Sequence, residues 1–96
     1  MAVREMPQQR IAGVTGATSG IGQATVARLV EAGMRVIANG RRLEKLEALK
    51  WQLNGTLGRV RSVPGDIRDP GVIQNMFRAS RESFGIDPSV MVLSAG

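Results

Sequence analysis

Three glycines with two hydroxyl side chains between them make residues 15–22 the part of the sequence best suited to binding a ligand. Gly16 allows a tight turn, Gly20 lets the backbone approach a pyrophosphate without a Cβ in the way, and Gly22 lets a helix pack closely against strands. The N–H groups and the dipole at the start of that helix attract phosphate. This spacing predicts a site for the pyrophosphate of a dinucleotide.

A glycine-rich turn that needs only positive φ angles is the alternative explanation of this segment. Three glycines together with the hydroxyls of Thr18 and Ser19 exceed what a turn requires, which favours a ligand site. The predicted contacts from this segment are Gly16, Thr18, Ser19, Gly20, Ile21 and Gly22.

The elements that must position this turn alternate between strand and helix. Short apolar runs predict strands over residues 10–15, 34–39, 59–64 and 89–93. Helical spacing and stop signals predict helices over residues 19–32, 43–53 and 70–84. Strands joined through helices pair in parallel. We therefore predict an α/β fold, an incomplete Rossmann-type doubly wound parallel sheet of about four strands and three helices in strand order 3-2-1-4.

Particular residues mark the ends and faces of these elements. Gly33 and Gly85 are predicted to end the first and third helices, and Asp69 to cap the third helix with Pro70 as its first residue. Gly13 is unusual inside a strand, where a larger apolar residue would pack. The second helix is predicted to turn four leucines toward the core, namely Leu43, Leu46, Leu49 and Leu53.

Composition excludes several classes of function. The content is 43% hydrophobic and 22% charged, with no long apolar run, so we expect a globular protein without a membrane partner and, by default, a cytoplasmic one. The chain has no Cys and no His, so we predict no disulfide and no metal site. The net charge of +5 is spread along the chain with few aromatic side chains, so no nucleic-acid partner is expected.

The motif at Thr15 to Gly22 resembles the TGxxxGIG cofactor motif of the short-chain dehydrogenase/reductase family. The similarity extends over residues 10–96, which we interpret as a partial NAD(P)-binding Rossmann domain after an N-terminal tail of residues 1–9. The resemblance implies an oxidoreductase that transfers hydride between a nicotinamide cofactor and a small-molecule carbonyl or alcohol.

The end of the second predicted strand selects the cofactor in this family, where an acidic residue binds the ribose 2′-hydroxyl of NAD. Here Gly40 stands at that place, and Arg41 and Arg42 follow as cations that could clamp a 2′-phosphate. The resemblance thus favours NADP(H) over NAD(H), with Arg41 as the main phosphate ligand. The alternative is a solvated start of the second helix in which Arg42 pairs with Glu44 or Glu47.

Two further segments resemble cofactor contacts of the family. Asp66 and the backbone N–H of Ile67 stand where the family contacts adenine, although Asp66 could equally be a turn residue that binds its own backbone. The terminal Leu93-Ser94-Ala95-Gly96 occupies the place of the NNAG motif. Leu93 and Ser94 replace the paired asparagines, whereas Ala95 and Gly96 match the motif and are predicted cofactor contacts.

Catalytic residues of the family cannot be placed on this sequence. The family uses a Tyr-x-x-x-Lys motif with a Ser and an Asn, whereas this chain has no Tyr, and Lys45 and Lys50 fall in the second helix. We therefore expect these 96 residues to be an inactive cofactor-binding half of a longer enzyme. A homo-oligomer is expected only of the full-length enzyme. The alternatives are a standalone NADP(H)-binding or regulatory module, or a remnant without function.

Overall fold

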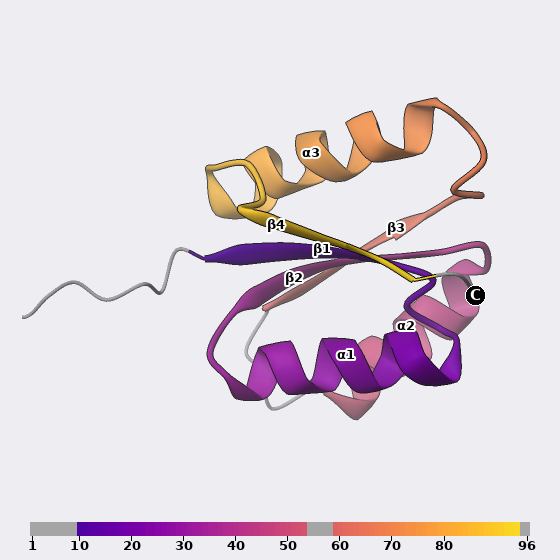
Figure 1. Cartoon of the computed structure of the whole chain (residues 1–96), viewed down its shortest axis with the longest axis vertical. Coiled ribbons are helices and arrows are strands. Elements are labelled where there is room, and N and C mark those ends of the chain that lie inside the picture. The colour runs from indigo at the N-terminus through magenta and orange to yellow at the C-terminus, as the bar shows by residue number, and fades with distance from the viewer. Residues whose placement is uncertain (1–9, 54–58, 95–96) are drawn as a thin grey trace, which may run out of the picture.

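The structure is a computed structural model that describes residues 10–53 and 59–94. Strands and helices alternate throughout (Figure 1), as the sequence predicts. The elements are β1 (Ile11–Thr15), α1 (Gly20–Glu31), β2 (Arg35–Gly40), α2 (Leu43–Gln52), β3 (Val60–Pro64), α3 (Gly71–Phe84) and β4 (Val90–Leu93).

One parallel sheet organises the chain. Its strands lie in the order β3-β2-β1-β4, and every neighbouring pair is parallel. Figure 1 shows α1 and α2 together on one face of the sheet and α3 on the other. The predicted α/β fold, an incomplete doubly wound Rossmann-type sheet, is therefore confirmed. All four strands end at the same edge, so the segments that follow them converge there.

Two hydrophobic cores lie on the two faces of the sheet. The core under α1 and α2 contains Val14, Ala17, Val26, Val30, Val36, Ala38, Leu46, Leu49 and Val60. The core under α3 contains Ile11, Ile37, Val63, Val72, Met76 and Ala79. The prediction for Leu43 is wrong, because 49% of its surface is exposed. It is the first residue of α2, and the contacts with the sheet begin one turn later at Leu46.

The ends of the helices follow the sequence signals closely. Gly33 and Gly85 have φ angles of 91° and 86°, the left-handed conformation that suits glycine after a helix. The Asp69 carboxylate accepts a hydrogen bond of 2.9 Å from the N–H of Gly71, as a capping side chain does, although the N-cap position of α3 is Pro70 and not Asp69 as predicted. Regular α3 begins at Gly71, one residue later than predicted, although Pro70 already has helical φ and ψ.

The side chains of two methionines occupy the space that a Cβ on Gly13 would take. A Cβ at this position would be 2.5 Å from Sδ of Met91 and 3.2 Å from Cε of Met76. Met91 comes from β4, the neighbour of β1 in the sheet, and Met76 comes from α3. These long, flexible methionine side chains thus fill the space that a larger side chain at position 13 would occupy.

Several apolar side chains remain exposed at the borders of the fold. β4 forms one edge of the sheet, and 70% of Leu93 on it is exposed. Trp51, in the last turn of α2, is 73% exposed. Within the described ranges, no helix has the length and hydropathy that crossing a membrane requires.

Candidate functional site

An open cleft of about 810 Å³ lies at the carboxyl edge of the sheet, where ligands bind in doubly wound folds. Segments that follow β1, β2, β3 and β4 all contribute to it. Its lining residues are Gly16, Thr18, Ser19, Asn39, Gly40, Arg41, Arg42, Lys45, Gly65, Asp66, Ile67, Arg68 and Ser94.

Most of the predicted contacts meet in this cleft although they are far apart in sequence. The lining includes seven of them, namely Gly16, Thr18, Ser19, Arg41, Arg42, Asp66 and Ile67. Gly20, Ile21 and Gly22 start α1 beside the cleft without lining it. Ala95 and Gly96 lie outside the described residues.

The three glycines of the first turn differ in what they make possible. Gly16 has a φ of 62°, which favours glycine, and so it forms the turn. A Cβ on Gly22 would lie 1.9 Å from the carbonyl oxygen of Gly16, so this glycine allows α1 to pack against the turn. A Cβ on Gly20 would meet no atom within 4 Å. The fold itself does not need Gly20, and the space beside it remains open to a ligand.

Ser19 joins the turn to the helix. Its Oγ accepts a hydrogen bond of 3.1 Å from the N–H of Gly22 and donates one of 2.8 Å to the carbonyl oxygen of Gly16. This is the side-chain cap expected at the start of α1. The serine therefore holds the first turn of the helix toward the cleft, with the remaining N–H groups at the positive end of the dipole.

The side chains of Thr18 and Leu46 pack closely around Gly40, the last residue of β2. A Cβ at Gly40 would lie 3.3 Å from Oγ1 and Cγ2 of Thr18 and 3.3 Å from Cδ2 of Leu46. A side chain at this position would therefore require the side chains of Thr18 and Leu46 to move by a few tenths of an ångström. The next residue, Arg41, emerges directly into the cleft.

Asn39 connects the ends of β2 and β3, a role that the sequence interpretation missed. The side chain is buried, with 1% exposed, and its amide donates to the carbonyl oxygens of Val63 and Gly65 at 2.9 and 3.1 Å. The backbone carbonyl oxygen of Asn39 accepts a hydrogen bond from the N–H of Ala17 at 2.8 Å. The one available signal was a polar residue ending an otherwise apolar strand. Asn39 thus holds three cleft segments together.

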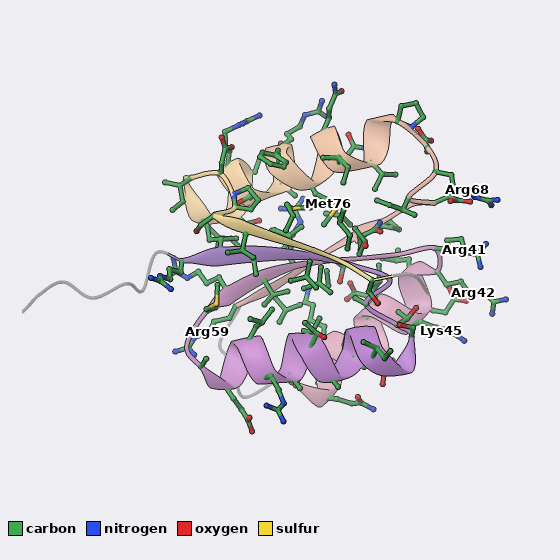
Figure 2. All side chains as sticks on the ribbon, viewed as in Figure 1. Arg41, Arg42, Lys45, Arg59, Arg68 and Met76 are labelled. Atoms are coloured by element: carbon green, nitrogen blue, oxygen red, sulfur yellow. The ribbon has the colours of Figure 1, made fainter. Side chains whose placement is uncertain are left out.

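Four cations line the cleft, and the sequence interpretation had identified two of them. Figure 2 shows Arg41, Arg42, Lys45 and Arg68 at the carboxyl edge of the sheet. Lys45 lies in the first turn of α2, three residues after the N-cap Arg42, so helical periodicity from Arg42 could have placed it there. In the described part of the chain, Arg41, Arg42 and Lys45 form no ion pair, and Glu47 pairs with Lys50 at 3.8 Å. The alternative in which Arg42 pairs with Glu44 or Glu47 is not seen.

Asp66 is both a turn residue and part of the cleft lining. Its Oδ1 accepts from the backbone N–H of Arg68 at 2.9 Å, which is the local turn that the sequence left open. The guanidinium of Arg68 also binds both carboxylate oxygens, with Nη2 at 2.6 Å from Oδ2. These bonds, and the charge of Arg41 nearby, hold the pKa of Asp66 far below its ordinary value.

The Asp66 carboxyl is therefore expected to stay ionised under acid conditions that protonate a free aspartate. Because its folded pKa lies below the unfolded value, its contribution to stability is present above the unfolded pKa and is lost as pH falls through the folded pKa. Carboxyl-carbon NMR titration should show this, and Arg68→Ala should return the pKa toward its ordinary value. An ordinary Asp66 pKa in the unmodified chain would contradict the pairing.

The segment after β4 is attached to β1 through Thr15. The N–H of Ser94 donates to Oγ1 of Thr15 at 3.0 Å, and Thr15 Oγ1 lies 3.4 Å from the carbonyl oxygen of Ser94. Ser94 lines the cleft. The backbone of Ser94 thus joins the end of the edge strand β4 to β1 without the asparagine amides of the family motif. No group of three His, Cys, Asp or Glu side chains suited to a metal ion occurs in residues 10–53 and 59–94.

Comparison with known proteins identifies the family. A model of the short chain dehydrogenase family matches residues 10–96. The chain belongs to the short chain dehydrogenase family. It is 42% identical to the NADP-dependent 3-hydroxy acid dehydrogenase of Salmonella typhi over 83 residues, which are 86% of this chain and 32% of that protein.

Solved structures of the family have the same arrangement. A short chain dehydrogenase from Bacillus anthracis superposes with a TM-score of 0.83 at 30% identity, covering 93% of this chain and 36% of that one. L-sorbose reductase from Gluconobacter frateurii, complexed with NADPH and L-sorbose, gives a TM-score of 0.80 at 28% identity, covering 91% and 33%. The chain spans about a third of the length of the relatives that it matches.

Proposed function

We propose that this chain is the NADP(H)-binding part of a short-chain dehydrogenase/reductase that transfers hydride between the nicotinamide and a small carbonyl or alcohol. The observation that carries the cofactor preference is a group of three cations beside Gly40, namely Arg41, Arg42 and Lys45, which form no ion pair among the described residues. A 2′-phosphate supplies the negative charge that this group lacks, whereas a 2′-hydroxyl does not.

The glycine turn fits the rest of such a cofactor. In this proposal the pyrophosphate occupies the open space beside Gly20 and accepts hydrogen bonds from the first N–H groups of α1. Arg41 binds the 2′-phosphate and Arg42 assists it. Asp66 and Ile67 contact the adenosine end, and Ala95-Gly96 would border the cofactor as in the family motif.

Names of relatives support the phosphate-bearing form. The Salmonella typhi relative is named as NADP-dependent, and the L-sorbose reductase structure is complexed with NADPH. In the whole protein, the nicotinamide would supply hydride chemistry, and a small carbonyl or alcohol would be the substrate. The 96 residues contain no Tyr or His, so we expect them to bind cofactor without turning over substrate. A cytoplasmic location and a homo-oligomer of the whole protein belong to the same proposal.

Titration of the chain with NADPH and NADH in a calorimeter tests the proposal. Tighter binding of NADPH is expected, and Arg41→Ala should weaken NADPH about 10- to 100-fold while changing NADH by less than about threefold, because a charge-assisted hydrogen bond to phosphate is lost. Arg78→Ala, an equal loss of charge from an exposed position on α3, is the matched control. Equal weakening of both nucleotides by Arg41→Ala would contradict the role of Arg41.

A further inference from the structure

A carboxylate is an unexpected component of a cleft proposed to bind a phosphate dianion. Asp66 is the sole acidic residue among those described as lining the cleft, and it lies beside four cations. A free carboxylate here would repel the 2′-phosphate and attract the arginines meant for it. The question is how the site tolerates Asp66.

Arg41 and Asp66 leave the sheet at neighbouring points that are firmly connected. The residues directly before them, Gly40 and Gly65, are hydrogen-bonded, with the N–H of Gly65 at 2.9 Å from the carbonyl oxygen of Gly40. The Asn39 amide holds Gly65 from the other side at 3.1 Å. The charge of Arg41 contributes to the lowered pKa of Asp66, as expected for neighbouring groups. Asp66 and Arg41 are therefore close enough to influence each other.

Arg68 binds both oxygens of the Asp66 carboxylate. Oδ1 accepts from the backbone N–H of Arg68 at 2.9 Å and from its Nε at 3.0 Å. Oδ2 accepts from Nη2 at 2.6 Å and from Nε at 3.2 Å. Three N–H groups of Arg68 make these contacts, since Nε–H is shared between the two oxygens, and they use most of the roughly four lone-pair positions of a carboxylate. Asp66 is thus paired mainly with Arg68 and not with Arg41.

We propose that Arg68 determines cofactor specificity by occupying Asp66, so that Arg41 remains available to a 2′-phosphate. Arg68 is then a positioning residue that acts through Asp66. This inference rests on the proposed binding of NADP(H). Figure 2 shows Arg68 and Arg41 on the same edge of the molecule, as the inference requires.

Removing Arg68 should therefore harm NADPH selectively. In Arg68→Ala the freed Asp66 carboxylate pairs with Arg41 and repels the 2′-phosphate, and both effects are specific to NADPH. We expect the preference for NADPH over NADH to fall about tenfold, as for one uncompensated charge near the phosphate. Because NADH carries no 2′-phosphate, its binding should change by less than about threefold.

The decisive experiment is rescue by a second substitution, measured by calorimetric titration of each variant with both nucleotides. Asp66→Asn in the Arg68→Ala background removes the freed charge and should restore the NADPH/NADH ratio to within about threefold of the original. Any adenine contact of Asp66 is common to both nucleotides and cancels in this ratio. Arg81→Ala is the matched control, since Arg81, in the last turn of α3, forms an exposed ion pair with Asp87 of the same 2.6 Å length and neither residue lines the cleft.

Other results would overturn the inference. If the ratio stays unchanged in Arg68→Ala, the arginine plays no part in specificity. If it falls and Asp66→Asn fails to restore it, Arg68 acts by touching the cofactor and not through Asp66. An equal fall in Arg81→Ala would reduce the effect to net charge. Failure of the unmodified chain to bind either nucleotide would instead overturn the proposed function, and the inference with it.

Discussion

Replacing Gly22 by alanine is expected to destabilise the fold by about 3 kcal/mol or more, whereas the same change at Gly20 should preserve the fold and abolish tight nucleotide binding. A Cβ on Gly22 would lie 1.9 Å from the carbonyl oxygen of Gly16 and 2.9 Å from Cα of Ala17, so backbone atoms would have to move. A Cβ on Gly20 would meet no atom of the described residues within 4 Å, but it would stand in the space proposed for the pyrophosphate.

Urea denaturation followed by circular dichroism, together with NADPH titration, measures the two effects separately. The free energy of unfolding of Gly20→Ala should lie within about 1 kcal/mol of that of the unmodified chain, because alanine favours helix. Its affinity for NADPH should fall more than tenfold, a loss of about 1.4 kcal/mol or more. Normal NADPH affinity in Gly20→Ala would place the pyrophosphate elsewhere. Normal stability in Gly22→Ala would mean that α1 can move away from the turn at little cost.

Replacing Asn39 by aspartate is the second substitution with a large expected effect, a destabilisation of about 3 to 5 kcal/mol. The buried amide donates to the carbonyl oxygens of Val63 and Gly65, and a carboxylate would set a negative charge against both acceptors. The size of the new side chain is almost unchanged, so the loss reports hydrogen bonding and charge. Lower pH should recover part of the stability, since a protonated carboxyl can donate one bond.

Asn75→Asp is the matched control for this substitution. Asn75 lies on the exposed surface of α3, where the same chemical change should alter the free energy of unfolding by no more than about 0.5 kcal/mol. Chemical denaturation at two pH values measures both variants. A stability of Asn39→Asp equal to that of the control would show that the contacts between the ends of β2 and β3 contribute little.

The fold could be predicted from the sequence because local signals agree with one another along most of the chain. Gly33 and Gly85 end their helices as predicted, and the alternation of apolar runs with helices leads to the parallel sheet order. Periodicity failed at Leu43, since a helical pattern does not say where contact with the sheet begins. The strand interior at Gly13 could not be understood either, because Met76 and Met91 reach it from distant parts of the chain.

The site could be predicted only where it lies on a local motif. The glycine turn and the Arg41-Arg42 pair are consecutive residues, so spacing alone brings them to attention. Asn39 acts through a partner on another strand, and Arg68 becomes meaningful only beside Asp66 and Arg41. Such contacts depend on which strands are neighbours and where their ends meet, which no short stretch of sequence records. The role of Thr15 toward Ser94, between β1 and the end of β4, was hidden for the same reason.

The exposure of Trp51 decides which spectroscopic assays can follow this chain. The single indole already lies in water, with 73% of its surface exposed, and it does not line the cleft. In the folded chain, the emission of Trp51 should therefore already resemble that of a denatured protein. It should change little on unfolding or on nucleotide addition. Fluorescence would report a folded, ligand-bound sample as denatured, whereas circular dichroism and calorimetry would register both states correctly.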